Sequence, residues 1–360
     1  MIEFRGVTKR FPDGTVAVDE LDLVAEQGRI TVFVGPSGCG KTTSLRMINR
    51  MIEPTGGELH VDGRDVLAAD PAELRRGIGY VIQQAGLFPH RTIVDNIATV
   101  PMLVGSSKKA ARDRAMELME IVGLDTSMAR RYPAQLSGGQ QQRVGVARAL
   151  AADPPVLLMD EPFSAVDPIV RESLQDELLR LQSELGKTIV FVTHDIDEAI
   201  KLGDRVAVFR VGGKLAQYDE PGVLLSRPVD DFVDSFVGRD RGYRGLGFLS
   251  SDDIPLGPLP VLSVGDPLPD DGWSLVVDGT GRPLGWVAAG DGPIGEDDVV
   301  PGGSLYTVGS GSLRGALDAA LSSPSGQGVA VDADGRVAGS VTADSVLEAL
   351  PAARDSHNAA

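Results

Sequence analysis

Residues 35–42 read Gly-Pro-Ser-Gly-Cys-Gly-Lys-Thr, and they lie between the apolar run Ile30–Val34 and a helical pattern over residues 42–51. The spacing G-x-x-x-x-G-K-[ST] between a strand and a helix is typical of a loop that wraps phosphate groups. Its backbone N–H groups curl around phosphate oxygens, and the helix N-terminus adds a favourable dipole. We expect Lys41 to reach the β- and γ-phosphates of ATP, and Thr42 to ligate Mg²⁺. The residues expected at the nucleotide phosphates are Gly35, Ser37, Gly38, Cys39, Gly40, Lys41, Thr42 and Thr43.

A second candidate site follows the apolar run Val156–Met159, which ends in Asp160 and Glu161. A buried strand of this kind delivers two carboxylates to its end. We expect Asp160 to hold Mg²⁺ through water, and Glu161 to orient or deprotonate the water that attacks the nucleotide. A hydrophobic run that ends in Asp-Glu is by itself often an ordinary strand end, but the phosphate loop in the same chain favours the catalytic interpretation.

The first two-thirds of the chain alternates short β-branched apolar runs with helical patterns. This alternation is typical of an α/β fold, in which helices cover a mostly parallel sheet. A polar, helix-rich insertion is expected at about residues 84–151, and it includes an amphipathic stretch at residues 108–122. The predicted strands are Ile30–Val34, Val156–Met159, Thr188–Val192 and Val206–Phe209.

The last third of the chain has a different composition. Residues 246–360 hold four Arg, no Lys and sixteen Asp or Glu, so they contribute −12 of the net charge of −17. This change predicts a separate C-terminal domain after a linker. An acidic surface repels phosphate backbones, which argues against nucleic-acid binding by this part. The ordinary interpretation of such a charge is a solvated, soluble surface.

The C-terminal part contains an internal repeat. Residues 275–287 align with residues 329–341, and six of the thirteen positions are identical. Each copy reads as a strand, an Asp-x-x-Gly turn and a strand, so each is predicted to be a hairpin. Helical stretches at residues 312–321 and 343–350 flank the second copy, whereas the first copy lacks both. Chance similarity between two glycine-rich hairpins is the alternative explanation.

A third motif narrows the class of nucleotide-binding protein. Residues 136–140 read Leu-Ser-Gly-Gly-Gln and resemble the signature motif of ABC ATPases. The resemblance implies that this segment opens a helix whose N-terminus faces the γ-phosphate held by a second copy of the chain. Two ATP molecules would then be sandwiched in a head-to-tail dimer; a simple helix cap is the alternative. The residues implied to act on the partner's nucleotide are Ser137, Gly138, Gly139, Gln140 and Asp167.

The other motifs of the ABC family follow in order along the chain. By this resemblance Gln83 contacts Mg²⁺ and links the site to a membrane subunit, His194 contacts the γ-phosphate, and Phe11 stacks on adenine. The family more often has Tyr at the position of Phe11, and an ordinary core or surface Phe is the alternative. The resemblance thus implies catalysis by Glu161, His194, Gln83 and Lys41, and a Mg²⁺ site formed by Thr42, Gln83 and Asp160.

Within the ABC family, the sequence looks most like importer ATPases for glycine betaine, carnitine, choline and proline betaine. The resemblance rests on residues 86–97, 160–169, 174–178 and 237–242. Members of that group commonly carry a C-terminal pair of CBS modules, and the hairpin repeat resembles a degenerate pair of them. The fold class is therefore a phosphate-loop ABC ATPase core with a helical subdomain plus a small α+β domain. The expected boundaries are an ATPase domain at 1–238, a linker at 239–251, the CBS-like pair at 252–350 and a disordered tail at 351–360.

The resemblance implies partners and a location. The implied partners are a second copy of the chain, transmembrane permease subunits and, indirectly, an external solute-binding protein. No nucleic-acid partner is implied. The chain has no run of about 20 apolar residues and only one cysteine, Cys39, so we expect a peripheral protein on the cytoplasmic face of the membrane. The rival interpretations are an importer ATPase for an amino acid or a metal, a non-transport ABC ATPase that acts on ribosomes or DNA, and a nucleotide-gated scaffold without catalysis.

Overall fold

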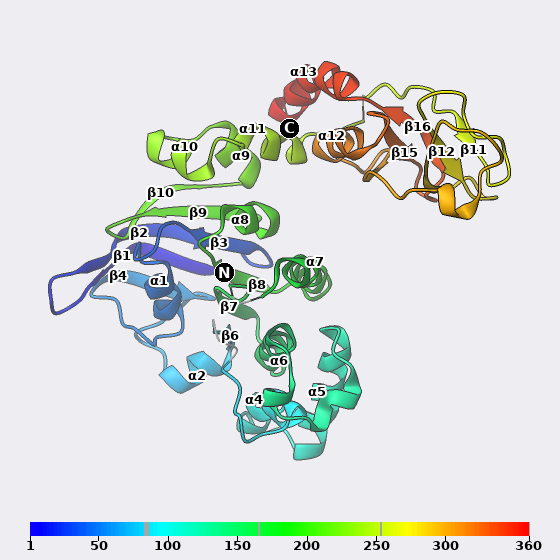
Figure 1. Ribbon diagram of the computed structural model, residues 1–360. Coiled ribbons are helices and arrows are strands. Elements are labelled where there is room, and N and C mark those ends of the chain that lie inside the picture. The colour runs from blue at the N-terminus through cyan, green and yellow to red at the C-terminus, as the bar shows by residue number, and fades with distance from the viewer. Residues whose placement is uncertain (83–85, 165, 253, 360) are drawn as a thin grey trace. The chain divides into compact units, whose positions relative to one another are not determined.

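The computed structural model describes residues 1–82, 86–164, 166–252 and 254–359. The chain divides into two compact units, Met1–Val237 and Gly238–Ala360 (Figure 1). Each unit has its own hydrophobic core and is described by itself. All of the residues predicted to bind or hydrolyse a nucleotide belong to the first unit.

The first unit is built on a six-stranded sheet with the strand order β10-β9-β3-β8-β7-β6. β9 and β10 pair antiparallel, whereas the other four pairs are parallel. β3, β7 and β8 are buried along their whole length, as is typical of parallel strands covered on both faces. The predicted α/β class is therefore confirmed. The strands are β3 (Ile30–Val34), β6 (Ile78–Val81), β7 (Val156–Asp160), β8 (Thr188–Val192), β9 (Arg205–Arg210) and β10 (Lys214–Asp219).

A second, antiparallel sheet in the same unit has the strand order β2-β1-β4-β5. Phe4 of this sheet packs against Phe33 of β3, with ring centroids 6.3 Å apart, so the two sheets share one core. None of its strands is among those predicted from the sequence. Its strands are β1 (Ile2–Arg10), β2 (Val16–Ala25), β4 (Gly56–Val61) and β5 (Arg64–Asp65).

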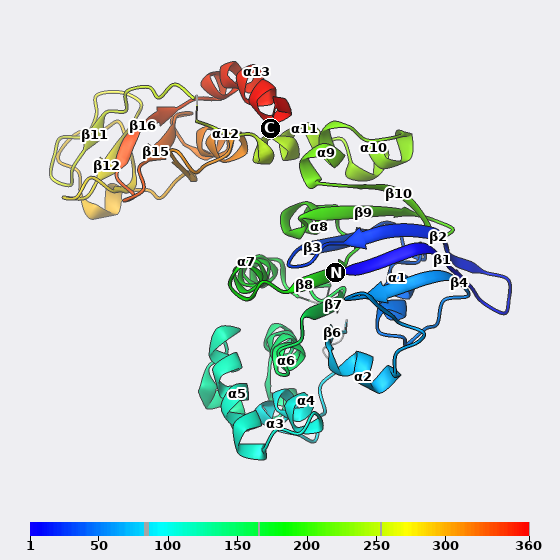
Figure 2. The same ribbon diagram turned by 180° about the vertical axis from the view of Figure 1, so that it is seen from behind.

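Helix α1 (Lys41–Ile48) contacts strands of both sheets (Figures 1 and 2). It buries Leu45, Met47 and Ile48 in the shared core. Because α1 begins at the last residues of the phosphate loop, this packing anchors the loop on the core. The remaining helices of the unit outside the insertion are α2 (Pro71–Arg76), α7 (Pro168–Leu185), α8 (Ile196–Leu202), α9 (Pro221–Ser226) and α10 (Asp231–Val237).

The insertion between β6 and β7 is helical, as predicted from its polar amphipathic pattern. Asn96 is fully buried there and organises the preceding loop. Its side chain accepts a hydrogen bond from Phe88 N at 2.7 Å and donates to the carbonyl oxygens of Phe88, Arg91 and Thr92 at 3.0–3.1 Å. The elements are α3 (Ile93–Ile97), α4 (Thr99–Leu103), α5 (Lys108–Ile121), the 3₁₀ turns η1 (Thr126–Arg130) and η2 (Pro133–Gln135), and α6 (Gly138–Leu150).

The second unit contains two three-stranded sheets of the same design. In each sheet the first two strands are parallel and the last two form an antiparallel hairpin. The two hairpins are those predicted from the repeat, which is therefore confirmed as a structural repeat. One sheet holds β11 (Val261–Leu262), β12 (Trp273–Val277) and β13 (Pro283–Ala288), and the other holds β14 (Leu305–Thr307), β15 (Gly328–Val331) and β16 (Val337–Val341).

The identical positions of the repeat build the same turn twice. The carboxylate of Asp278 accepts hydrogen bonds from Thr280 N and Arg282 N at 2.7 and 3.0 Å. The carboxylate of Asp332 accepts the equivalent bonds from Asp334 N and Arg336 N at 2.9 and 2.8 Å. The glycines that end the two turns have φ values of 84° and 78°, which a side chain disfavours. Turn chemistry thus explains why these residues recur.

Two stretches of the second unit are more ordered than the sequence analysis predicted. Residues 351–359, expected as a disordered tail, continue helix α13 (Ala343–Ala359), because Ala353 packs into the core of the unit. The segment expected as a linker contains α11 (Arg241–Gly245) and the 3₁₀ turn η3 (Leu246–Phe248), and Leu246 and Leu249 join the same core. The other helical elements are α12 (Leu313–Ser322) and the 3₁₀ turn η4 (Glu296–Asp298).

Candidate functional site

The phosphate loop connects β3 to α1 and depends on glycine at close approaches. A Cβ atom on Gly35 would lie 2.3 Å from the carbonyl oxygen of Phe209, and one on Gly40 would lie 2.0 Å from the carbonyl oxygen of Ala17. Gly40 also has a φ of 97°, in the left-handed region that favours glycine. The backbone therefore adopts a curled path that no other residue type at these positions would permit.

Lys41 is buried inside this loop, with 6% of its surface exposed. Its ammonium group donates hydrogen bonds to the carbonyl oxygens of Gly35 at 2.7 Å and Pro36 at 2.9 Å, and lies 3.6 Å from Cys39 Sγ. Burial is the main influence on Cys39 and raises the pKa of its thiol, although Lys41 acts in the opposite direction. The loop therefore holds one positive charge at its centre beside a neutral thiol.

Asp160 ends β7 next to the first turn of α1. Thr42 Oγ1 donates a hydrogen bond to Asp160 Oδ1 at 2.8 Å, and Tyr80 O–H lies 3.4 Å from Oδ2. Arg46 Nη2 lies 3.8 Å from the same carboxylate, which is largely buried. Burial, and secondarily the charge of Asp160, raise the pKa of Tyr80, so the phenol stays a donor. Thr42 and Asp160 are predicted from their motifs, whereas Tyr80 and Arg46 carry no motif and are not predicted.

The oxygen atoms of Thr42 and Asp160 are the ligand type that Mg²⁺ prefers. Across the described parts of the chain, no group of three or more His, Cys, Asp or Glu side chains is placed to hold a metal. A site with one or two protein oxygens, completed by phosphate oxygens and water, is the usual arrangement for Mg²⁺ in nucleotide sites. These residues therefore fit a Mg²⁺ ion that arrives with a nucleotide.

Glu161 and His194 lie together at the ends of adjacent parallel strands, β7 and β8. The distance between His194 Nδ1 and Glu161 Oε2 is 3.2 Å. Glu161 has a φ of 46°, a conformation that costs a non-glycine residue free energy and that clusters at functional sites. Its backbone N–H donates to the carbonyl oxygen of Val192 at 2.9 Å, which holds the turn in place. The structure thus brings together two residues that are 33 positions apart in the sequence.

For two of the predicted site residues, Gln83 and Phe11, the structure does not test the expected contact. Gln83 lies outside the described residues. Phe11 follows β1 in the turn to β2, is half-buried, and has Lys9 Nζ 5.3 Å from its ring centroid. Its adenine contact remains a prediction.

The segment 137–140 opens α6 with a complete capping box. Ser137 Oγ accepts a hydrogen bond from Gln140 N at 3.3 Å, and the Gln140 side chain accepts one from Ser137 N at 3.0 Å. Gln140 therefore has a structural role in its own chain. The N-terminus of a 13-residue helix, with Gly138 and Gly139 in its first turn, can bind an anion, since its first N–H groups have no helical partners.

Asp167 is exposed and precedes α7, where its carbonyl oxygen accepts a hydrogen bond from Arg171 N at 2.8 Å. A Cβ atom on Gly139 would lie 3.1 Å from Val170 Cγ1 and 3.9 Å from Val166 Cγ1. The signature segment and the Asp167 segment are therefore packed against each other. Both segments are predicted to act on the partner's nucleotide, but this contact between them is not predicted from the sequence.

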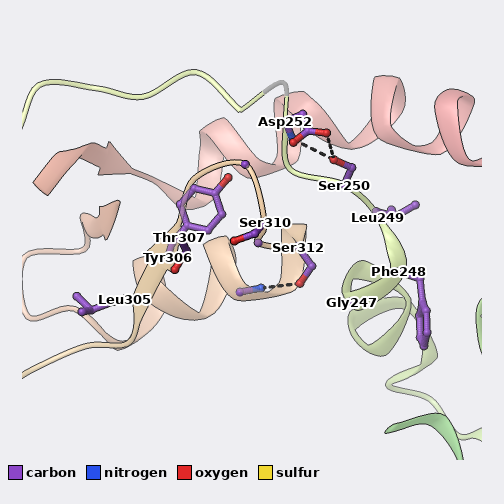
Figure 3. Close-up of a pocket in the computed structure, with 13 residues that line it drawn as sticks. Gly247, Phe248, Leu249, Ser250, Asp252, Leu305, Tyr306, Thr307, Ser310 and Ser312 are labelled. Carbon is purple, nitrogen blue, oxygen red and sulfur yellow. Dashed lines mark hydrogen bonds between the residues drawn. The ribbon is translucent and has the colours of Figure 1, made fainter. Parts of the chain in front are cut away.

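The second unit contains an open, polar pocket of about 680 Å³ (Figure 3). Tyr306 O–H donates to Ser251 Oγ at 2.8 Å beside it, and Ser250 Oγ donates to Asp252 Oδ2 at 2.7 Å. Ser312 caps helix α12 at the same place, accepting from Gly315 N. Among the described residues that line the pocket, none is Lys, Arg or His, and Asp252 is negatively charged. Such a lining disfavours a phosphorylated ligand.

Comparison with known proteins identifies related chains. A family model described as ABC transporter matches residues 18–164. The chain is 43% identical over 372 residues to the osmoprotectant import ATP-binding protein OsmV of Salmonella typhimurium, covering 98% of this chain and 97% of OsmV. It is 53% identical over 241 residues to the carnitine transport ATP-binding protein OpuCA of Listeria monocytogenes, covering 67% of this chain and 60% of OpuCA.

The fold also has solved relatives. The ATP-binding cassette MJ0796, in a dimeric post-hydrolysis state bound to ADP and Pi, superposes with a TM-score of 0.57 and 35% sequence identity. The match covers 61% of this chain and 99% of that one. In the described ranges, no helix combines the length and the apolar character needed to cross a membrane.

Proposed function

Because this chain belongs to the family of ABC transporter ATP-binding proteins, we propose that it hydrolyses ATP to drive an importer of quaternary-amine osmoprotectants. Glycine betaine, carnitine, choline and proline betaine are the solutes of this class. The observation that carries the ATPase proposal is the end of β7, where Asp160 is bonded to Thr42 and Glu161 lies 3.2 Å from His194. The names of OsmV and OpuCA support the solute class.

The phosphate loop is the proposed binding site of the triphosphate. Lys41 exchanges its two carbonyl partners for oxygens of the β- and γ-phosphates, which bear a full negative charge and so form stronger hydrogen bonds. The N–H groups of the loop and of α1 hold the remaining oxygens. Phe11 stacks on the adenine ring.

Thr42 and Asp160 would hold Mg²⁺, together with Gln83, which lies outside the described residues. When bound, Mg²⁺ supplies neutralisation of the charge on the β- and γ-phosphates. Arg46 helps to orient Asp160, since its guanidinium lies 3.8 Å from the carboxylate.

Glu161 is the proposed general base. Its carboxylate orients the attacking water and accepts its proton. His194 holds that carboxylate in position and contacts the γ-phosphate. Positioning by a third group is the usual way in which an active base is fixed. The left-handed backbone of Glu161 serves the same purpose, because it sets the direction of the side chain.

A second copy of the chain completes each pocket. Ser137 and the N–H groups of Gly138 and Gly139 form an anion site on the surface of their own chain, and we propose that they face the γ-phosphate held by the partner. The dimeric MJ0796 structure supports this arrangement. The remaining partners are transmembrane permease subunits, with an external solute-binding protein reached through them, so the chain works at the cytoplasmic face of the membrane.

The solute class is tested by purifying the chain with its membrane partners and reconstituting them in vesicles. Glycine betaine or carnitine, presented with the solute-binding protein, is expected to raise ATPase activity by about 5-fold or more, the lower range of coupling between two sites. An amino acid or a metal ion that raises the rate while betaines do not would overturn the solute class. Co-purification with ribosomes instead of membrane chains would favour the non-transport alternative.

The second unit is proposed to be a CBS-like module with a dimerisation or regulatory role. Removing residues 239–360 is expected to leave ATP binding and basal hydrolysis within about twofold, because all nucleotide-site residues and their core lie in the first unit. Control of transport by osmotic conditions is expected to change. Loss of ATP binding in the truncated chain would contradict this assignment, and cutting at 251 is a poorer test because it exposes Leu246 and Leu249.

A further inference from the structure

A buried polar cluster next to the proposed active site has no part in the chemistry described above. Glu198 of α8 is 6% exposed, and so is Gln175 of α7. Glu198 accepts hydrogen bonds from Thr193 Oγ1 at 2.6 Å and from Gln175 Nε2 at 3.2 Å. Burial is the largest influence on this carboxyl and raises its pKa. Because a buried carboxyl group is costly unless its partners are in place, Glu198 links Thr193, the neighbour of His194, to Gln175 of α7.

Arg171 lies one turn before Gln175 on the same face of α7. Its Nη2 donates to the carbonyl oxygen of Val166 at 3.2 Å, and its Nη1 lies 3.8 Å from Asp195 Oδ2. Arg171 Nε is buried and, among the described residues, has no hydrogen-bond acceptor. The guanidinium group of Arg171 therefore links Val166, which precedes Asp167, to Asp195, which follows His194.

The other side of the same segment contacts the signature helix. Val166 and Val170 pack against Gly139, where an added Cβ atom would lie 3.9 and 3.1 Å from their Cγ1 atoms. The start of α7 thus contacts Gly139 and follows Asp167, two residues that are proposed to serve the partner's pocket. Through Arg171 it also contacts Asp195, which follows His194 in the chain's own pocket.

We propose that Arg171 and Gln175 are positioning residues that couple the two ATP pockets of the dimer, by tying the Asp167 segment to the His194 loop. This inference rests on the proposed function, since it requires composite pockets. When the Asp167 segment docks on the partner's nucleotide, Val166 and Arg171 move as a unit. Asp195 and Gln175 transmit that movement to the loop that sets His194 against Glu161. Hydrolysis in one pocket therefore depends on closure of the other, through a contiguous set of bonded groups.

The test is the ATP-concentration dependence of hydrolysis by the full-length protein. We expect a Hill coefficient between 1 and 2 for the unchanged chain. Arg171→Met is expected to bring the coefficient close to 1 and to lower kcat by about 5-fold or more, with less change in the half-saturating ATP concentration. Arg171→Lys, which keeps the charge and can reach one of the two acceptors, is expected to be intermediate.

Arg180→Met is the matched control. Arg180 lies on the same helix and is bonded to Glu177 and Glu184, away from both loops. It is expected to leave the Hill coefficient and kcat unchanged. Should Arg171→Met fail to fold, Arg171→Lys and Gln175→Leu give the same readout.

Three outcomes would overturn the inference. The first is an Arg171→Met protein that unfolds at a lower temperature but keeps the Hill coefficient and kcat of the unchanged chain, which would make the network purely structural. The second is a coefficient of 1 for the unchanged chain while its hydrolysis still requires Glu161; this would remove the coupling and leave the proposed function intact. The third is a chain without any ATPase activity, which would remove both.

Discussion

Replacing Glu161 with Gln is expected to lower kcat for ATP hydrolysis by about 10²–10⁴-fold, the usual contribution of a general base. Glutamine keeps the shape of the side chain but does not accept the proton of the attacking water. The phosphate loop is unaffected, so ATP affinity is expected to stay within about twofold of that of the unchanged protein. The measurement is phosphate release at saturating ATP, together with binding of a fluorescent ATP analogue.

Glu53→Gln is the control for this experiment. Glu53 is an exposed residue that pairs with Arg50 at the surface, with 60% of its side chain accessible, and its replacement is expected to change neither rate nor affinity. Normal turnover by the Glu161→Gln protein would remove Glu161 from the role of base. It would also leave its strained backbone and its contact with His194 without a functional explanation.

Replacing Lys41 with Met is expected to weaken ATP binding by about 10²-fold, since each hydrogen bond to a charged group contributes about 1.5–3 kcal/mol. The buried ammonium group is the only cation that the described structure places inside the loop. Because a ligand that binds the native state raises its unfolding temperature, thermal unfolding with and without ATP and Mg²⁺ reports this loss directly.

Lys187→Met is the matched control for Lys41→Met. Lys187 also has a largely buried side chain, 13% exposed, and its ammonium group pairs with Asp153 at 2.7 Å away from the loop. Its replacement is expected to lower stability and to retain the ATP-dependent rise in unfolding temperature. A Lys41→Met protein that retains that rise as well would show that the loop does not bind the triphosphate as proposed.

Sequence patterns were sufficient for the elements whose signals are local. β3 and β8 begin and end at the predicted residues, because each is a buried run of five apolar or β-branched residues that starts directly after a charged residue. The repeat was found because Asp278 and Asp332 build the same hydrogen-bonded turn. The second sheet was missed because β4 and β5 are short and largely exposed and acquire their partners only through the fold. The longer β1 and β2 mix charged with apolar residues and are only partly buried.

The residues of the candidate site also divide into those with a local sequence signal and those whose role depends on the fold. Lys41, Thr42, Asp160, Glu161 and His194 belong to contiguous motifs, and the structure brings the last four into two bonded pairs. Arg46, Tyr80, Arg171 and Glu198 have no motif of their own, and Gln175 lies in the stretch 174–178, which resembles a family but indicates no role for it. Their roles depend on which helix face meets which strand end, and the sequence alone does not give that information. The end of α13 was mispredicted for a related reason: Ala353 is buried by tertiary packing, which a polar sequence conceals.

The most direct test of the account is the mass in solution of the Glu161→Gln protein without residues 239–360, measured by light scattering with ATP and Mg²⁺. Removing the second unit leaves the composite pocket as the proposed source of a dimer. The composite pocket predicts a stable dimer of twice the mass of one truncated chain. It also predicts that adding Ser137→Arg to the same chain restores the monomer while ATP stays bound, because the larger cationic side chain blocks the partner's pocket and not its own. A truncated Glu161→Gln protein that binds ATP and keeps the mass of one chain would contradict the account.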